Sequence, residues 1–256
     1  GVEVLYGKWF ADHINDWLET NGEYINFTLL NRPHISIKYI DAIKKYTKSK
    51  IIYYGHDLHY LREQREFELT NNQALLDSSR SWKKMEFELF EKSDVIYYPS
   101  QVEVEEIKKH FPHYNVRAIP AYIFNEPSEK VVHDFSKRKD LLFVGGFGHR
   151  PNVDAVLWFV KEIFPIILKD LSDIRFYVVG SNPPDEIKRL HSENVIVTGF
   201  VSDKELSEYY HHCKIAVVPL RYGAGVKGKV VEALYHQIPI ITTSVGSEGL
   251  EDIGDY

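Results

Sequence analysis

KIAVVPLRYGAGVKGKVVEAL, residues 214–234, combines an apolar run, a glycine-rich loop and a helical pattern in one short stretch. The apolar run ends at Pro219 and is typical of a strand in a parallel sheet, where both faces are covered. Ligands of open α/β sheets lie beyond the carboxyl ends of the strands, where a helix N-terminus offers unpaired N–H groups to a phosphate. Gly223, Gly225 and Gly228 would let the backbone approach such a ligand closely. The stretch therefore predicts a phosphate-binding strand, loop and helix.

Two charged residues strengthen this interpretation. Lys229, in the first turn of the predicted helix, can add a positive charge to the same phosphate. Glu232 follows three residues later on the same helix face, where a carboxylate can accept hydrogen bonds from ribose hydroxyls. The alternative is that the glycines only make the turn, that Lys227 and Lys229 are solvated, and that Glu232 stabilises the helix start. The preceding strand and the spacing of Glu232 favour nucleotide binding.

The rest of the chain repeats the alternation of strands and helices. From Leu141 onward it predicts one doubly wound lobe, from the segments LLFVGG, NVDAVLWFVKEIFPIILKD, IRFYVVG, PDEIKRLH, NVIVTG, DKELSEYYHH, KIAVVPL, KVVEALYHQ and IPIITT. The first half predicts a second lobe, from a strand at EVLYG, a helix from Trp9 to Leu18, and then INFTLL, ISIKYIDAIKKY, IIYYGHD, a long helical region to Lys92, DVIYYPS and VRAIPAYI. Ser100 with Glu103 and Ser202 with Glu205 have the spacing of capping boxes.

The predicted organisation is two Rossmann-like α/β lobes joined by a linker. Residues 1–124 form the first lobe, the polar stretch 125–139 is the linker, and 140–256 form the second lobe. The chain opens on a strand-like run and stops soon after a strand, so we expect both lobes to be incomplete and the chain to be a fragment. At 256 residues it exceeds a typical domain of roughly 100 to 200 residues.

Composition narrows the classes of function. The net charge of −6 gives no overall attraction to nucleic acid, so we expect no nucleic-acid partner. Cys213 is the one cysteine, which excludes an internal disulfide framework and suits a reducing compartment. The sequence given shows neither a leader pattern nor a run of about 18 apolar residues. The expected location is the cytoplasm, with any membrane contact peripheral, at the inner membrane.

The glycine-loop residues also carry a resemblance to a known family. The chain resembles the GT-B retaining glycosyltransferases of family 4, also called group 1, many of which have a pattern similar to G-x-G-x-(R/K)-x-K-x-x-E-A followed by P-(V/I)-(V/I)-x-T. The matching positions are Gly223 or Ala224, Gly225, Lys227, Lys229, Glu232, Ala233, Pro239 and Thr242. FVGGFGHRPNVDAVLWFVKEIFP resembles the opening of the same lobe and VTGFVSDKELSEYY its middle, so the resemblance spans Leu141 to Leu250. YYGHDLHYLREQRE, EKSDVIYYPSQVE and VRAIPAY are similar to the acceptor lobe, less specifically.

The resemblance implies roles for the residues of the second lobe. Lys229, with Lys227, would neutralise the donor diphosphate, Glu232 would hold the ribose, and backbone at Phe200 and Val201 would meet the base. The sequence departs from the family's E-x7-E pattern, because Ala224 stands where the first Glu contacts the transferred sugar.

The glycine loop GGFGHRPN is a further candidate donor site, although such a loop also occurs where it only makes a turn. Gly146 occupies the position of an Arg that many members carry, and Arg150 is the candidate to compensate.

In the first lobe, His56 and Asp57 directly follow a predicted strand. If the sheet is parallel, these two residues would face a crevice between the lobes. The resemblance implies that His56 contacts the donor sugar, so His56 and Lys229 are the candidate catalytic residues. A loop hydrogen-bond cluster and a metal pair of His56 with His59 remain as alternatives. Since the sequence holds no Asp-x-Asp, we expect no metal, and no cofactor besides the sugar donor.

The function predicted from the sequence is metal-independent transfer of a sugar from a nucleoside diphosphate to a hydroxyl of a glycan or lipid-linked acceptor, with retention implied by the resemblance. One alternative is a GT-B epimerase or phosphorylase. Another is a catalytically idle module that binds a sugar nucleotide or serves as a scaffold, motivated by Ala224 and the expected missing ends.

Overall fold

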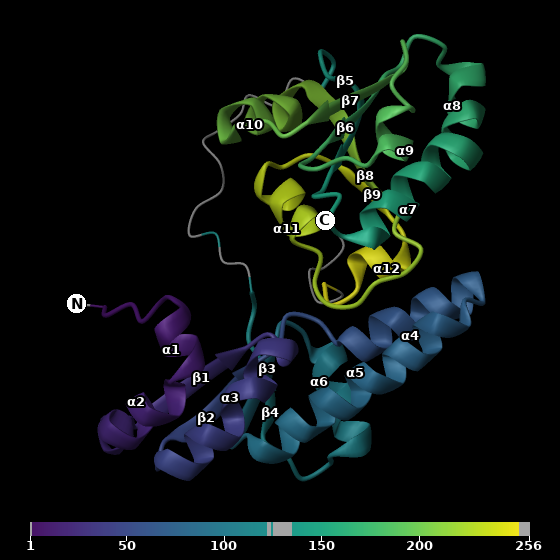
Figure 1. Cartoon of the computed structure of the whole chain (residues 1–256). Coiled ribbons are helices and arrows are strands. Elements are labelled where there is room, and N and C mark those ends of the chain that lie inside the picture. The colour runs from purple at the N-terminus through teal and green to yellow at the C-terminus, as the bar shows by residue number, and fades with distance from the viewer. Residues whose placement is uncertain (1, 122–123, 125–134, 251–256) are drawn as a thin grey trace. The chain divides into compact units, whose positions relative to one another are not determined.

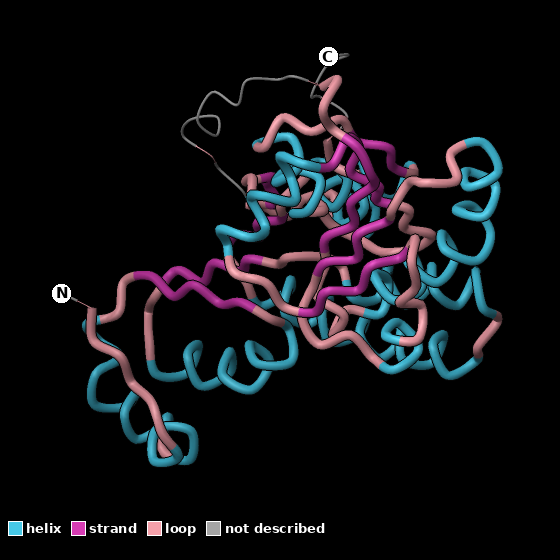
Figure 2. The backbone as a smooth tube through the Cα atoms, turned by 90° about the horizontal axis from the view of Figure 1, so that it is seen from above, coloured by secondary structure: helices cyan, strands magenta, loops and turns pink. Residues whose placement is uncertain are grey.

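The computed structural model describes residues 2–121, 124 and 135–250, in two compact units, 1–121 and 122–256 (Figure 1). Each unit contains one parallel sheet with helices between successive strands. Figure 2 shows the strands of both sheets in magenta beside the cyan helices. Most of the predicted linker, residues 125–134, lies outside the described residues, and Lys139 already belongs to a strand.

Unit 1 holds a four-stranded sheet in the order β1-β2-β3-β4. The strands are β1 Phe27–Asn31, β2 Lys50–Tyr54, β3 Val95–Tyr98 and β4 Val116–Ala118. The helices are α1 Lys8–Asp12, α2 Ile14–Asn21, the 3₁₀ turn η1 Gly22–Tyr24, α3 Pro33–Tyr46, α4 His59–Thr70, α5 Gln73–Lys92 and α6 Gln101–His110. Alternate strand residues such as Tyr53 and Tyr98 are buried in one core with residues of α3, α5 and α6. On the edge strand β1, Phe27 and Leu29 are exposed.

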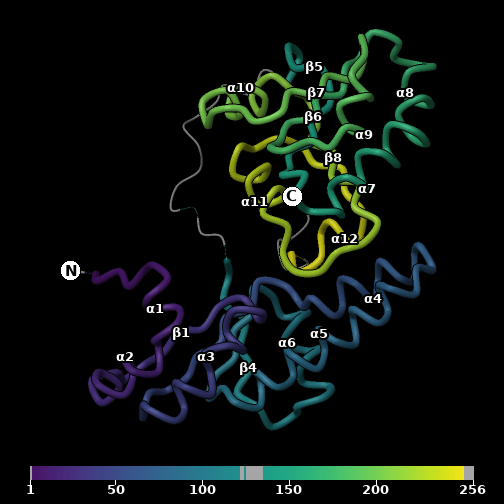
Figure 3. The backbone as a smooth tube through the Cα atoms, viewed as in Figure 1, coloured from purple at the N-terminus to yellow at the C-terminus, as the bar shows by residue number. Residues whose placement is uncertain are grey.

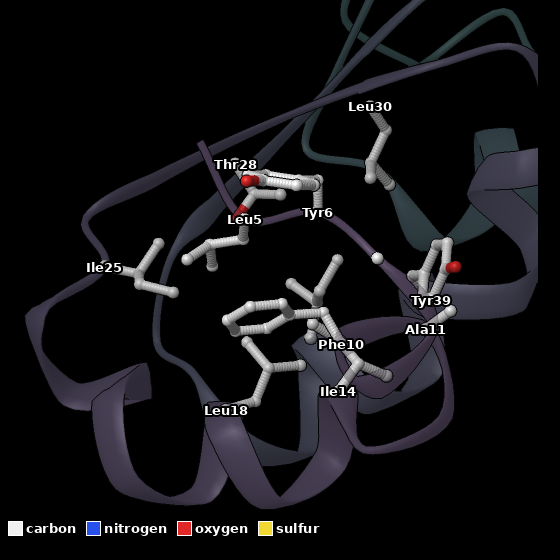
Figure 4. A pocket seen from close by; sticks show the side chains of 12 residues that line it. Leu5, Tyr6, Phe10, Ala11, Ile14, Leu18, Ile25, Thr28, Leu30 and Tyr39 are labelled. Atoms are coloured by element: carbon white, nitrogen blue, oxygen red, sulfur yellow. The ribbon is translucent and has the colours of Figure 1, made fainter. Parts of the chain in front are cut away.

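The start of the chain differs from the sequence prediction. EVLYG forms no strand, and Leu5 and Tyr6 instead line an apolar pocket of about 420 Å³ together with residues of α1, α2, α3 and β1 (Figure 4). The helix predicted from Trp9 to Leu18 is two helices, because His13, with φ of −121°, lies outside helical geometry between them. Apolar periodicity continues across such a break, so the sequence pattern did not reveal it.

Unit 2 holds a five-stranded sheet in the order β7-β6-β5-β8-β9. The strands are β5 Lys139–Val144, β6 Phe176–Val179, β7 Val195–Gly199, β8 Cys213–Val218 and β9 Ile240–Thr242. The helices are α7 Arg150–Trp158, the π-helical turn η2 Phe159–Ile163, α8 Phe164–Asp170, α9 Asp185–Lys188, α10 Asp203–His212, α11 Gly228–Tyr235 and α12 Ser244–Ser247. The long helix predicted after β5 is interrupted near Pro165, which lacks a backbone N–H for the helical ladder.

Helices cover both faces of the second sheet. Phe143 belongs to a core with residues of α7 and α8, whereas its neighbour Leu142 belongs to a second core with Tyr210 of α10 and Ala233 of α11. Burial on both faces explains why the strands are continuous apolar runs in the sequence. The predicted doubly wound lobe is confirmed, as are the capping boxes at the starts of α6 and α10.

The chain order places a topological switch point in this sheet. From β5 the chain moves to β6 and β7 on one side and returns through β8 and β9 on the other. Figure 3 traces the connection from β8 to α11. Because all pairings are parallel, the loops after β5 and β8 leave the same edge of the sheet side by side, which is where ligands of such sheets bind.

Close backbone contact between β5 and β6 at this edge predicts a stability effect. A Cβ added to Gly180 would lie 1.9 Å from the Gly145 carbonyl oxygen, whereas a Cβ on Gly148 would meet no heavy atom within 4 Å. Gly180→Ala is expected to lower the free energy of unfolding by about 1 to 3 kcal/mol because backbone must shift. Gly148→Ala is the matched control with little expected effect. Equal urea midpoints for the two variants would contradict the close packing.

Candidate functional site

The starts of α7 and α11 meet at the switch point of unit 2. The Lys229 ammonium, in the first turn of α11, donates a hydrogen bond to Asn152 Oδ1 in the first turn of α7. Lys229 Nζ also lies 4.9 Å from the centre of the Phe143 ring on β5. Asn152 and Lys229, which are 77 residues apart in the sequence, therefore join the two loops through one hydrogen bond.

Asn152 also holds the glycine loop that follows β5. Its side chain is buried, and its Nδ2 donates to the Gly146 carbonyl oxygen at 2.8 Å. The amide thus accepts from Lys229 with one end and donates to the loop with the other. Asn152 was not among the site residues predicted from the sequence. The available signal was a polar residue next to Pro151, directly after a glycine loop and at the start of a helix.

Burial changes the acid–base chemistry of Lys229. Removal from water, with a smaller effect of the nearby Lys227 charge, lowers the pKa of Lys229 to about 7. Lys229 also lies near a helix N-terminus, whose partial positive charge opposes a cation. An anion bound beside it would relieve these penalties.

Lys227 is held within its own loop. Its ammonium donates to the Gly225 carbonyl oxygen and lies 3.9 Å from a Glu248 carboxylate oxygen, and the side chain is buried. Gly225 has a φ of 77°, a conformation that favours glycine. The sequence left open that Lys227 and Lys229 are both solvated. For Lys227 this alternative is excluded, because the side chain is only 8% exposed. Lys229 is partly buried.

Glu232 lies on the same helix as Lys229 but contacts a different element. A Glu232 carboxylate oxygen accepts a hydrogen bond of 3.2 Å from the buried Tyr210 hydroxyl of α10. Burial raises the pKa of Glu232, and the Asp203 charge adds to this, while the Tyr210 hydroxyl opposes it. Tyr210 was not among the predicted site residues, because an aromatic residue in an amphipathic helix gives no sign of its hydroxyl's partner.

The other predicted donor residues follow strands of the same parallel sheet. Gly146 is exposed in the loop after β5, and Arg150 is exposed as the first residue of α7. Phe200 and Val201 follow β7, where Phe200 is 81% exposed and Val201 packs against the core that contains Tyr210. The roles predicted for all these residues remain predictions.

His56 lies in unit 1, just beyond β2. Its exposed imidazole Nε2 is 3.1 Å from Asn31 Oδ1, at the end of the neighbouring strand β1. The ring also meets Tyr54 edge to face. A metal site at His56 and His59 gains no support, because no group of three or more His, Cys, Asp or Glu within the described residues could hold an ion.

Residues 138–254 match the model of a family described as glycosyl transferases group 1. The second unit is therefore similar to the group 1 glycosyl transferases over most of its length. An uncharacterized 44.6 kDa protein in the cps region of Klebsiella pneumoniae is 30% identical over 132 residues, which cover 46% of this chain and 34% of that protein. The 2-deoxystreptamine N-acetyl-D-glucosaminyltransferase of Niallia circulans is 29% identical over 115 residues, covering 43% of this chain and 28% of the enzyme. The matched region is thus about a third of each relative's length.

A solved structure shares the fold of both units. The structure of a mutant of S. aureus TarM with Fondaparinux, alpha-GlcNAc-glycerol and UDP has a TM-score of 0.66 at 15% identity, covering 94% of this chain and 46% of that one. The fold is GT-B, as predicted, with two Rossmann-like parallel-sheet lobes. Within the described residues no helix is long and apolar enough to cross a membrane.

The low pKa of Lys229 predicts that a diphosphate bound beside this side chain would be accompanied by uptake of a proton. The free protein holds Lys229 with a pKa of about 7, so the amine is mostly neutral at pH 8. A bound diphosphate favours the ammonium, so binding at pH 8 should take up nearly one proton, and affinity should fall as pH rises from 7 to 9. Calorimetry of UDP binding in buffers of different ionisation enthalpy measures this uptake. Lys229→Ala should abolish it, and an uptake that persists in this variant would assign the proton elsewhere.

Proposed function

We propose that the protein is a glycosyltransferase that moves a sugar from a nucleoside diphosphate to a hydroxyl of a glycan or lipid-linked acceptor. The observation that carries this proposal is the partly buried Lys229, held by Asn152 at the switch point of a unit similar to the group 1 glycosyl transferases. Among the described residues no carboxylate forms an ion pair with Lys229, and an anionic ligand would supply the missing negative charge. The phosphates of a nucleotide suit this position at the ends of β5 and β8.

The reaction places its main electrostatic demand on the leaving group. The bond between the sugar's anomeric carbon and the diphosphate oxygen breaks and a bond to the acceptor oxygen forms. The proton of the acceptor hydroxyl passes to the departing diphosphate oxygen. Negative charge therefore grows on the diphosphate while the sugar becomes oxocarbenium-like. Protonated Lys229 and the N–H groups at the start of α11 stabilise that charge. We propose that the anomeric configuration is retained and that neither a metal ion nor another cofactor is required.

The relatives' names support the substrate class. One is named as an N-acetyl-D-glucosaminyltransferase, and solved structures of the same fold contain UDP or UDP-2-fluoro glucose. Two relatives are encoded in a cps region. We therefore propose a UDP-sugar donor and a role in polysaccharide biosynthesis. The proposed location is the cytoplasm, with peripheral contact at the inner membrane where a lipid-linked acceptor would be met.

The first test of this function uses Lys229 and Glu232. Lys229→Ala should weaken UDP binding by about ten- to over a hundredfold, because a charge-assisted contact is lost, and should leave uridine binding nearly unchanged. Glu232→Ala should weaken UDP and uridine alike, because it removes a partner of the ribose. Calorimetry in EDTA measures both ligands without free metal.

Lys214→Ala is the matched control, because this exposed lysine lies near the opposite end of β8. If Lys229→Ala and Glu232→Ala both retain normal affinity and an unaltered melting temperature, the donor site is not at the start of α11.

The second test separates binding from chemistry. His56→Ala should keep the Kd for UDP and lower the rate of sugar transfer, because His56 belongs to the other unit and is proposed to contact the sugar. His113→Ala, an exposed histidine in the turn before β4, is the control and should leave both quantities unchanged. Loss of UDP binding in folded His56→Ala would overturn the role proposed for His56.

A further inference from the structure

Glu86 of α5 is a fully buried carboxylate that caps another helix. Its two oxygens accept hydrogen bonds from the backbone N–H groups of His59 at 2.9 Å and Tyr60 at 3.1 Å, the first two residues of α4. These N–H groups have no partner within α4, and the positive end of the helix favours an anion there. Leu58 at the N-cap provides no side-chain cap, so Glu86 supplies the cap from outside.

The same carboxylate anchors the segment that carries His56. Nδ1 of His59 lies 3.3 Å from a Glu86 oxygen and 3.5 Å from an Asp57 oxygen. Asp57 is in turn paired with Arg62, one turn into α4. Residues 57–59 are therefore tied to α4 and α5 by charged and backbone contacts immediately after His56.

Gly55, the residue before His56, is held in place by close contacts with β3. A Cβ added to Gly55 would lie 2.2 Å from Cζ of the fully buried Tyr98, so the chain passes directly over that ring. The Gly55 N–H donates to the Tyr97 carbonyl oxygen at 2.9 Å. His56 is thus an exposed residue with fixed neighbours on both sides. Before it, Gly55 packs against Tyr98 of β3, and after it the start of α4 is hydrogen-bonded to Glu86.

A buried charge is a costly way to cap a helix. Asp or Ser at the N-cap would serve α4 locally, whereas Glu86 must remain desolvated in the core. What the distant carboxylate adds is a mechanical link between α5 and the segment that presents His56. We propose that Glu86 is a positioning residue, which sets the orientation of His56 toward the sugar through His59 and the start of α4. This inference rests on the proposed role of His56 in sugar transfer.

The orientation of His56 can be measured in the whole chain without a substrate. The experiment compares Glu86→Gln with the control variant Ser79→Ala. The control removes another buried link between α5 and α4. That link is the 2.7 Å hydrogen bond from the Ser79 hydroxyl to the Tyr60 carbonyl oxygen. The His56 ring Cε1–H signal, assigned with His56→Ala, should shift and broaden in Glu86→Gln. Amide exchange at residues 59 and 60 should accelerate. Ser79→Ala should leave the His56 signal in place.

Turnover gives the second readout. With the nucleoside diphosphate sugar that is turned over fastest in a panel of UDP-sugars, Glu86→Gln should lower kcat by about ten- to a hundredfold with little change in KM or in the Kd for UDP. The double variant Glu86→Gln with His56→Ala should be no slower than His56→Ala alone, because both changes remove the same contribution.

Distinct results overturn distinct claims. An unchanged His56 signal and kcat in folded Glu86→Gln would overturn the positioning role, as would an equal effect of Ser79→Ala. If no UDP-sugar is turned over, the proposed function fails. If His56→Ala transfers sugar normally, the function stands but the role proposed for His56 fails. In either case the His56 signal still decides whether Glu86 orients the ring. Should Glu86→Gln not fold, Glu86→Asp, which keeps the charge but withdraws it by one methylene, must displace the same signal.

Discussion

The hydrogen bond from Lys229 to Asn152 joins the two loops that form the proposed donor site. It forms because β5 and β8 are neighbours in the sheet although they are far apart in the chain. Asn152 accepts from Lys229 with Oδ1 and donates from Nδ2 to the Gly146 carbonyl oxygen, so one amide links the glycine loop to the Lys229 side chain. The site is therefore preorganised before any ligand arrives.

The two units use charges at helix starts in opposite ways. In unit 1, the Glu86 anion satisfies the start of α4, which is the favourable sign for that end of a helix. In unit 2, Lys229 places a cation at the start of α11, which is the unfavourable sign. Burial and Lys227 make this worse and lower the pKa of Lys229 to about 7. In the first arrangement the helix start already has its anion, whereas the second would be completed by the bound anion that we propose.

Much of the fold was predictable because the burial of a strand or helix determines which of its residues are apolar. Leu142 and Phe143 face opposite cores, so β5 is a continuous apolar run that marks a parallel strand. The sequence predictions were wrong where a segment has the residue pattern of one element but folds differently. EVLYG has the composition of a strand, yet it forms none, and Leu5 and Tyr6 line a pocket. Two helices predicted as continuous are interrupted, one at His13 and one by the π-helical turn before Pro165, although their apolar patterns run on without a break.

The sequence by itself determined the alternation of strands and helices, the glycine loop before α11 and the identity of Lys229 and Glu232 as charged residues on one short helix. These follow from local preferences, which neighbouring residues are enough to express. Only the tertiary structure decided the partners. Asn152 joins Lys229, Tyr210 joins Glu232, and Glu86 joins the segment after His56, each across 20 or more residues of chain. Such contacts depend on which strands become neighbours and which helices share a face, and the burial that results sets the pKa of Lys229.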